Sequence, residues 1–176
     1  MGDYGVLFQT TLKTNRKQFP VTATLPIETA DGIFRAHYSN NGLARLDFPN
    51  GKIPKINSEN ISREVRTWHR LTAQALHQVL SGKPAKKFPP LDLSRGTDFQ
   101  KQVWGALQKI KQTISYTQLA AILNQPKSAR AVGGACGKNP IPVLIPCHRV
   151  LAANGKLGGF SGGLSWKIKL LERELH

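Results

Sequence analysis

Residues 115–137 read "SYTQLAAILNQPKSARAVGGACG" and predict two short helices joined by a tight turn. Ser115 can cap a helix over 115–123, because its hydroxyl can accept hydrogen bonds from the free N–H groups of the first turn. Pro126 ends this helix, since its ring forces the preceding residue out of the α region. Residues 128–137 then form a second helix, which carries Arg130. The pattern is typical of a helix-turn-helix, although helix pairs that bind no ligand share it.

The charge around this helix pair is strongly positive. The chain carries 25 Lys and Arg against 10 Asp and Glu, a net charge of +15, and its isoelectric point is near 10.3. Between Asp98 and Glu172 there are ten basic residues and no carboxylate. Such a distribution favours a surface that binds a polyanion over a basic face that is merely solvated. Nucleic acid is the first candidate for this partner and an anionic membrane the second. No apolar run reaches membrane-spanning length and no signal peptide is evident, so we expect a soluble cytoplasmic protein, or a nuclear one in a eukaryote.

The preceding residues predict a separate α/β unit. Strand-like runs at 33–38 and 43–48 flank "NNG", a tight-turn signal, and therefore predict a hairpin. Apolar residues recur at helical spacing over 62–80. Residues 82–96, rich in Pro, Lys and Gly, read as a linker or an extended wrap. We place a domain boundary near residue 92, which gives an N-terminal domain over 1–92, with its linker from about 82, and a C-terminal domain over 93–176.

The second unit is predicted to be mostly helical. Thr97 or Asp98 can cap a helix that begins there. The last helix, over 164–175, is expected to present one apolar face, formed by Leu164, Ile168, Leu171 and Leu175.

One of the two cysteines lies in "IPCHRV" (145–150), between a proline and a histidine. Prolines at 140, 142 and 146 predict that residues 139–146 run extended up to Cys147. A disulfide framework is improbable with only one other cysteine, Cys136, and a zinc site would need more ligands than His148. Cys147 is therefore either a nucleophile with His148 as its base or a buried apolar thiol. A base needs a carboxylate to orient it, and periodicity does not choose between Glu172 and Glu174.

Several motifs in order resemble the O6-alkylguanine-DNA alkyltransferases. They are "GTDFQKQVWGALQKI", "ISYTQLAAIL", "ARAVGGACGKNPIPVL", "IPCHRV", "GGFSGG" and "KLLERE". The resemblance covers about residues 91–176 and extends loosely to "GLARLDF" (42–48). It implies a ribonuclease-H-like α/β N-terminal domain with an antiparallel sheet plus helices. It also implies a mostly α C-terminal domain with a helix-turn-helix.

The resemblance implies direct-reversal DNA repair after base flipping. The thiolate of Cys147 would take the alkyl group of O6-alkylguanine, or of O4-alkylthymine, by SN2 attack, and the stable thioether would limit each molecule to one turnover. His148 would accept the thiol proton through a water, and Glu174, not Glu172, would orient His148. Asn139 would hold this relay by side-chain hydrogen bonds; without the resemblance it reads as an ordinary turn residue. Tyr116 would protonate the leaving guanine; without the resemblance it reads as a half-buried aromatic residue at a helix start.

The resemblance also assigns contacts to the flipped base. The N–H of Ser161 would donate to O6, and the carbonyls of Cys147 and Val150 would accept from the 2-amino group. Phe160 replaces a tyrosine of some members and would pack on the base. Pro142 and Gly158 would be pocket-wall positions that leave room for adducts larger than methyl.

On the DNA side, Arg130 would fill the gap left by the flipped base; the alternative is a phosphate contact. The second helix would enter the minor groove of double-stranded DNA, where small residues fit a narrow space. The proposed DNA-binding residues are Lys127, Ser128, Ala129, Arg130, Ala131 and Gly133. We expect no cofactor, no metal, no membrane partner and a monomer in solution. An alkyltransferase-like sensor and a cysteine hydrolase are the alternatives, but such sensors lack the acceptor cysteine.

Overall fold

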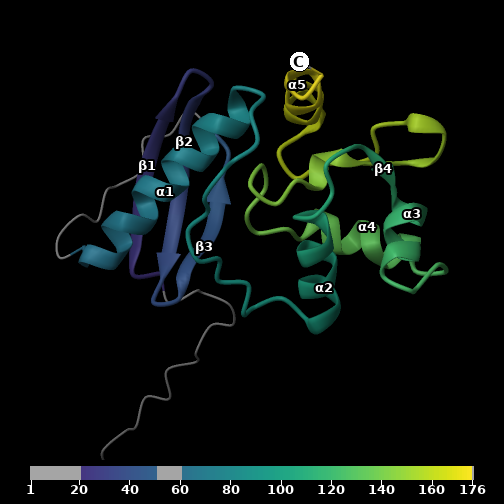
Figure 1. Cartoon of the computed structure of the whole chain (residues 1–176), viewed down its shortest axis with the longest axis horizontal. Helices are drawn as coiled ribbons and strands as arrows, with labels where there is room; N and C mark the ends of the chain where they lie inside the picture. The colour runs from purple at the N-terminus through teal and green to yellow at the C-terminus, as the bar shows by residue number, and fades with distance from the viewer. Residues whose placement is uncertain (1–20, 51–60, 176) are drawn as a thin grey trace, which may run out of the picture.

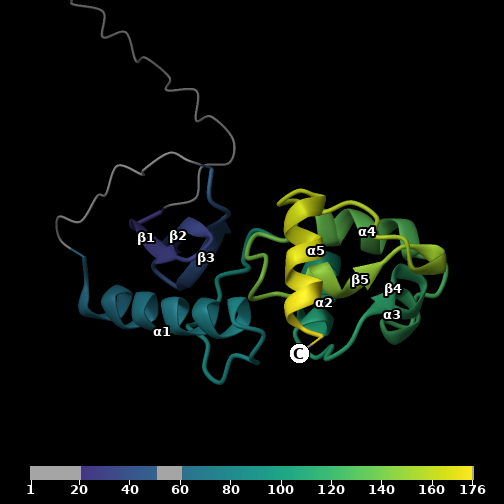
Figure 2. The ribbon, with the colours of Figure 1, turned by 90° about the horizontal axis from the view of Figure 1, so that it is seen from above.

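The computed structural model describes residues 21–50 and 61–175. Its N-terminal part holds a three-stranded antiparallel sheet in the order β1-β2-β3, and the long helix α1 lies along one face of the sheet (Figure 1 and Figure 2). The bounds are Ala23–Thr29 for β1, Gly32–Ser39 for β2, Gly42–Asp47 for β3 and Arg63–Leu80 for α1. The predicted hairpin and the helix predicted over 62–80 are confirmed.

Strand β1 extends the hairpin that the sequence pattern predicts. Pro26 weakens the strand signal of this segment in the sequence, because proline lacks the N–H that an interior strand needs. Among the described residues β1 is an edge strand that pairs only with β2, with Pro26 opposite Arg35. An edge position tolerates the missing donor.

Alternate residues of the sheet form the core beneath α1. Leu25 and Ile27 pair with Ala36 and Phe34, and all four side chains are buried. Tyr38 lies on the same face, and its hydroxyl donates to Oγ1 of Thr72 on α1 at 2.9 Å. This period-two burial is the pattern of a sheet with one face packed and the other solvated.

The C-terminal part is mostly helical, as predicted. Its elements are α2 (Asp98–Leu107), β4 (Ile114–Ser115), α3 (Tyr116–Ile122), α4 (Ala129–Gly137), the 3-10 turns η1 (Cys147–Arg149) and η2 (Ala153–Gly155), β5 (Val150–Leu151) and α5 (Leu164–Arg173). Thr97 and Ser115 cap α2 and α3, each within a complete capping box.

Helices α3 and α4 form the predicted pair. The connection between them turns at Asn124, whose φ of 58° is tolerated better by asparagine than by most residues. Helix α4 packs against both α2 and α3, and the indole N–H of Trp104 donates to the carbonyl of Ala135 at 2.9 Å. The pair therefore has a fixed geometry, while its role in DNA binding stays a prediction.

The prediction that residues 139–146 run extended is wrong. Pro142 and Ile145 pair across a tight turn, and the N–H of Ile145 donates to the carbonyl of Ile141 at 2.9 Å. At the tip, Val143 has φ 73°, a strained conformation for a β-branched residue. The three prolines fix only their own φ angles, so they leave the chain free to reverse between them. Cys147 accordingly begins a 3-10 turn and does not lie on an extended strand.

The predicted inner face of the last helix is also wrong. Leu164, Ile168 and Leu175 are 50%, 41% and 81% exposed, whereas Lys167 and Leu170 are buried. Helix α5 is rotated from the expected orientation, and Leu171 of the predicted face is partly buried. The buried amine of Lys167 donates to the carbonyls of Val150 and Leu157, and these bonds stabilise the observed orientation.

Hydrogen bonds and ion pairs join the linker and α5 to the N-terminal sheet. Residues 90–92 run beside β3, where the N–H of Leu43 donates to the carbonyl of Pro90 and the N–H of Asp92 donates to that of Leu43, both at 2.8 Å. The predicted linker is thus an extended wrap along the sheet edge. Asp31, in the β1–β2 turn, forms ion pairs with Lys169 and Arg173 of α5 at 2.9 and 2.6 Å.

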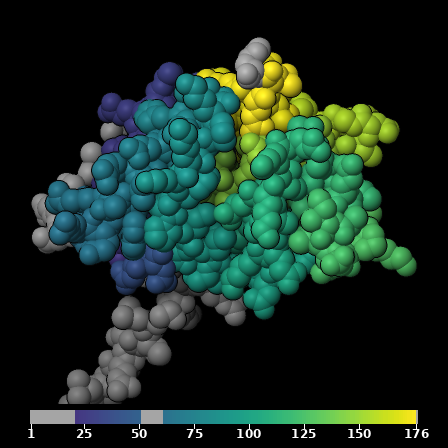
Figure 3. Space-filling view, in the orientation of Figure 1, coloured from purple at the N-terminus to yellow at the C-terminus, as the bar shows by residue number. Residues whose placement is uncertain are grey.

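In the space-filling view the N-terminal and C-terminal parts are in contact, and α5 of the C-terminal part (yellow, at the top) lies beside the N-terminal part (Figure 3). The predicted boundary near residue 92 stays a prediction. Within residues 21–50 and 61–175, no helix is long and apolar enough to cross a membrane.

Asp31→Asn is expected to lower the free energy of unfolding at neutral pH by about 1–2 kcal/mol, because both ion pairs to α5 are lost. The pairs, with hydrogen bonds from Arg173 as the largest cause, lower the pKa of Asp31 from 3.8 to about 2. The stabilisation is therefore complete above pH 3.8 and is lost as the pH falls through 2. Urea unfolding of both proteins at several pH values measures the difference, which should shrink towards acid pH. Glu28→Gln, an exposed carboxylate of the same sheet, is the control and should change little.

Candidate active site

The amide side chain of Asn139 organises the turn that leads to Cys147. Its Nδ2 donates to the carbonyl of Ile145 at 2.8 Å and to Sγ of Cys147 at 3.1 Å. Its Oδ1 accepts from the N–H of Ile141 at 3.0 Å. Because Asn139 is 6% exposed, these bonds form away from solvent. One side chain therefore fixes both arms of the strained turn and contacts the thiol itself.

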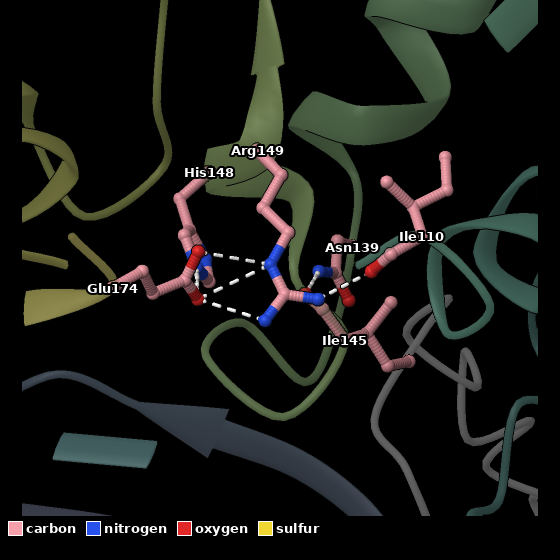
Figure 4. A network of polar contacts seen from close by, with 6 residues as sticks. All are labelled: Ile110, Asn139, Ile145, His148, Arg149 and Glu174. Atoms are coloured by element: carbon pink, nitrogen blue, oxygen red, sulfur yellow. Dashed lines mark hydrogen bonds and ion pairs between the residues drawn. The ribbon is translucent and has the colours of Figure 1, made fainter. Parts of the chain in front are cut away.

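Glu174 connects the last helix to the residue after the cysteine (Figure 4). Its Oε1 lies 2.8 Å from Nε2 of His148, whose side chain is fully buried. Of the two carboxylates that the sequence left open, Glu174 makes this contact, while Glu172 is exposed. The structure thus brings together His148 and the glutamate that the family resemblance selected.

Arg149 holds the same carboxylate from the other side. Its Nε and Nη2 donate to Glu174 at 2.9 to 3.1 Å, and its Nη1 donates to the carbonyl of Ile110 (Figure 4). Burial alone would raise the pKa of Glu174, but the hydrogen bonds from His148 and Arg149 outweigh it and lower the pKa to about 2. Glu174 is therefore ionised at neutral pH and can only accept hydrogen bonds.

The ionised carboxylate determines the tautomer of His148. Since Glu174 only accepts, Nε2 of His148 carries a proton, and a neutral imidazole then has its acceptor at Nδ1. Within the part of the chain that the structure describes, this buried Nδ1 has no hydrogen-bond partner. His148 is thus arranged to accept a proton at Nδ1. The structure gives no direct hydrogen bond between His148 and Cys147.

Cys147 is a buried thiol, 4% exposed. Burial raises its pKa, because a thiolate loses hydration there, while the hydrogen bond from Asn139 and the charge of Lys167 act in the opposite direction. Such a thiol needs a base to become the reactive thiolate.

The thiol faces a pocket of about 570 Å³. The lining residues come from α3, α4, the cysteine turn and the glycine-rich loop, and are Tyr116, Ala129, Arg130, Gly133, Cys136, Gly137, Cys147, Gly159, Phe160 and Ser161. Seven of them are predicted site residues, so the structure gathers segments that are far apart in the sequence. Burial raises the pKa of Tyr116, so its hydroxyl stays protonated at neutral pH and can donate.

Other predicted residues lie beside this pocket. A Cβ built on Gly158 would lie 3.3 Å from the hydroxyl of Tyr116, so the small residue permits a close approach. Pro142 lines a neighbouring pocket and not the one at the thiol. On α4 and the residues just before it, Lys127, Arg130 and Ala131 are exposed, while Ser128 is partly exposed.

Lys167 is a site residue that the sequence analysis missed. Its side chain is fully buried, and Nζ donates to the carbonyl of Val150 at 2.7 Å and to that of Leu157. It joins the strand after Cys147 to the start of the glycine-rich loop. The carbonyl of Val150, predicted to receive the 2-amino group of the base, therefore already accepts one hydrogen bond. A lysine between apolar neighbours in an amphipathic helix normally points to solvent, so only its tertiary contacts reveal it.

Among residues 21–50 and 61–175, no group of three or more His, Cys, Asp or Glu side chains could hold a metal ion. Both cysteines are free and buried.

Sequence comparison places these residues in a known family. Residues 98–176 match the family described as "6-O-methylguanine DNA methyltransferase, DNA binding domain". A methylated-DNA–protein-cysteine methyltransferase of Methanosarcina barkeri is 39% identical over 154 residues, which cover 84% of this chain and 94% of that protein. The chain belongs to the methylated-DNA–protein-cysteine methyltransferases. The resemblance on which the sequence analysis relied is thereby confirmed, and this methyltransferase is a DNA-binding enzyme of DNA repair.

Two further relatives differ in how much of their length this methyltransferase matches. The bifunctional transcriptional activator/DNA repair enzyme Ada of Escherichia coli is 51% identical over 106 residues, but the chain spans only 30% of Ada's length. Among solved structures, OGT of Mycobacterium tuberculosis in complex with DNA superposes with a TM-score of 0.69 at 33% identity. That match covers 85% of this methyltransferase and 91% of that chain, so it extends across the N-terminal sheet as well.

Arg149→Met is expected to raise the pKa of Glu174 from about 2 towards its ordinary value of 4.5, because the hydrogen bonds and the positive charge of Arg149 are lost while the hydrogen bond from His148 remains. It should also lower the free energy of unfolding by about 2–3 kcal/mol, since a partly buried carboxylate loses its cation. Side-chain carbon NMR gives the pKa, and urea unfolding gives the stability. Lys109→Met removes a nearby exposed cation and should change neither quantity. An unchanged pKa in Arg149→Met would show that His148 alone holds Glu174 ionised.

Proposed function

We propose that this methyltransferase repairs O6-alkylguanine, and O4-alkylthymine, in double-stranded DNA by one irreversible transfer of the alkyl group to Cys147. The observation that carries the proposal is the arrangement around the thiol. Cys147 faces a pocket that is lined by Tyr116, Phe160 and Ser161, and the ionised Glu174 leaves a free acceptor on the neighbouring His148. A soft sulfur nucleophile suits attack on an alkyl carbon and needs no cofactor or metal.

The proton of the thiol moves first in the proposed reaction. Nδ1 of His148 accepts it through a water, and the ion pair with Glu174 stabilises the resulting imidazolium. Asn139 donates to Sγ and stabilises the thiolate as it forms. Sequence neighbours in a 3-10 turn need not contact each other, and a bridging water joins these two without a direct bond.

The thiolate then attacks the alkyl carbon. The new S–C bond forms as the C–O6 bond breaks, and the electron pair of that bond passes to the guanine. Tyr116 donates its proton to a ring nitrogen, so guanine leaves neutral. The phenolate of Tyr116 then regains a proton from water and His148 releases to water the proton taken from Cys147, so that the net change is transfer of the thiol proton to guanine. The thioether has no leaving group of comparable quality, so the protein is consumed in a single turnover.

The flipped base is held by backbone and by aromatic packing. The N–H of Ser161 donates to O6, Phe160 packs on the ring, and the carbonyls of Cys147 and Val150 receive the 2-amino group. The carbonyl of Val150 can accept this second bond beside Lys167, because a carbonyl oxygen has two lone pairs. Gly158 leaves room for alkyl groups larger than methyl, whereas Pro142 contributes from the neighbouring pocket and shapes the wall only indirectly.

Helix α4 is proposed to enter the minor groove as the second helix of a helix-turn-helix. Its exposed face combines Arg130 with small residues, and Lys127 and Ser128 precede it beside the groove. Arg130 lines the pocket as well, which suits a side chain that fills the gap left by the flipped base. The absence of carboxylates between Asp98 and Glu172 supports phosphate contact. The similar OGT of Mycobacterium tuberculosis was solved in complex with DNA, which supports DNA binding.

The remaining elements of the proposal follow from the family. The N-terminal domain, to about residue 92, is ribonuclease-H-like and supports the C-terminal domain that binds DNA and transfers the alkyl group. The protein acts as a monomer in the cytoplasm, or in the nucleus of a eukaryote, and has no membrane partner.

Intact-mass measurement tests the reaction. After incubation with duplex DNA that contains O6-methylguanine, the wild-type protein should gain one methyl group, which peptide mapping should place on Cys147. Cys147→Ser should gain none, and Cys136→Ser, a matched change of the other buried thiol, should still be methylated. Release of more than one product per protein would indicate a cysteine hydrolase. Tight binding without any mass gain would indicate a sensor of damaged DNA.

Arg130→Ala is expected to slow methyl transfer more than it weakens binding, because the flipped state loses the side chain that replaces the base. We expect a loss of roughly tenfold in the transfer rate at saturating DNA, which corresponds to about 1.4 kcal/mol. Single-turnover kinetics and equilibrium binding separate the two effects. Lys127→Ala is the matched control and should mainly weaken binding. A loss confined to affinity in Arg130→Ala would make this residue a phosphate contact.

A further inference from the structure

Phe48, just after β3, reaches from the N-terminal sheet to the glycine-rich loop of the active site. Its ring centroid lies 5.7 Å from that of Phe160, at 69° between the planes. It lies 4.9 Å from Trp166 of α5 and 5.6 Å from Phe34 of β2. Phe34 also contacts Trp166 at 5.4 Å. The four rings form one aromatic cluster that crosses from the sheet to the loop and to α5.

The backbone of the loop approaches the same ring closely. A Cβ built on Gly162 would lie only 2.5 Å from Cε2 of Phe48, well inside a normal carbon contact. The ring cannot easily move aside, because Phe34, Phe160 and Trp166 surround it. Gly162 does not have a positive φ, so the close approach to Phe48, and not backbone conformation, requires glycine at this position.

The loop that Phe48 contacts forms part of the reactive pocket. Phe160 and Ser161 line the pocket together with Cys147. Phe160 also contacts His148, with centroids 6.5 Å apart and perpendicular planes. Phe160 therefore links Phe48 both to the pocket proposed for the flipped nucleobase and to His148, although Phe48 itself does not line the pocket.

Other anchors of the loop lie at its ends. At its start, Lys167 donates to the carbonyl of Leu157. At its end, the N–H of Gly163 donates to the carbonyl of Phe160 at 3.1 Å, a bond within the loop itself. Gly159 and Ser161 are exposed. Between these ends, the rings of Phe48 and His148 contact Phe160 from outside the loop, and Phe48 is the contact that comes from the N-terminal sheet.

We propose that Phe48 is a positioning residue, through which the N-terminal sheet sets the geometry of the substrate-binding loop. This inference rests on the proposed alkyl transfer. Phe48 holds Phe160 and the backbone of Ser161 at the distance where the flipped base meets Sγ of Cys147. The ion pairs of Asp31 with Lys169 and Arg173 keep the sheet and α5 in register around the cluster. The N-terminal part is thus more than a passive support, because it contributes to the rate of transfer without touching the base.

A double-mutant cycle tests this coupling. The variants are Phe48→Ala, Gly162→Ala and the double variant, and each is compared with wild type by single-turnover methyl transfer from duplex DNA. Phe48→Ala and Gly162→Ala should each slow the transfer step at saturating DNA by roughly tenfold, as expected for a misplacement below about 1 Å. DNA affinity should change less than about twofold, because α4 carries the DNA contacts. The double variant should be no slower than Phe48→Ala, because removing the ring gives the new methyl group its space.

A matched control separates positioning from loss of stability. Leu76→Ala removes a fully buried side chain of α1 that is not part of the aromatic cluster, and should destabilise the protein without slowing transfer below its unfolding temperature. Alkylation of Cys147 by iodoacetamide should proceed at the wild-type rate in Gly162→Ala, since this small reagent does not use the loop.

The outcomes are distinguishable. A wild-type protein that gains no methyl group overturns the proposed function, and the coupling with it. If wild type reacts, equal rates in Phe48→Ala overturn the coupling alone. Equal slowing by Leu76→Ala would reduce Phe48 to a packing residue. A cost of Gly162→Ala that persists in the double variant would show that the glycine is needed for another reason.

Discussion

The carboxylate of Glu174 is the group on which the rest of the site depends. It accepts from His148 and from Arg149, and Arg149 in turn reaches the carbonyl of Ile110 after α2. Arg149 therefore connects the end of α5, the cysteine turn and the segment that follows α2. Because hydrogen bonds from His148 and Arg149 keep Glu174 ionised, the carboxylate imposes one tautomer on the buried His148 and leaves Nδ1 as its acceptor. The proposed proton transfer depends on the same contact that joins these segments.

Around this centre, buried polar side chains hold the backbone of the site in place through hydrogen bonds to its carbonyl and N–H groups. Asn139 holds both arms of the turn at Val143, which has a strained backbone, and Lys167 joins β5 to the glycine-rich loop. Both side chains are buried and satisfied, which makes each costly to remove. The aromatic cluster of Phe34, Phe48, Phe160 and Trp166 adds an apolar connection to the sheet. The loop is thus fixed from two sides by different kinds of interaction.

Local sequence signals predicted the secondary structure well wherever local interactions decide it. Thr97 and Ser115 cap the helices that they were expected to cap, and "NNG" connects the predicted strands. The signals failed where distant residues decide the outcome. The prolines of 139–146 predicted an extended segment, but Asn139 stabilises a tight turn there. Apolar periodicity in α5 predicted an inner face, but Lys167 finds two carbonyls inside the protein, and Leu164, Ile168 and Leu175 are exposed.

By itself, the sequence determined most of the helices, two strands of the N-terminal sheet, the basic and carboxylate-free character of the stretch between Asp98 and Glu172, and the resemblance to a known family. These properties depend on residue types and on neighbours within about one turn of helix or strand. Local periodicity could not choose between Glu172 and Glu174; the family resemblance selected Glu174, and the tertiary structure shows its contact with His148. Only the tertiary structure decided that Lys167 is buried and that Phe48 meets Phe160 and Gly162. Each of these contacts joins segments far apart in the chain, so its geometry depends on how the whole fold packs, which no local periodicity encodes.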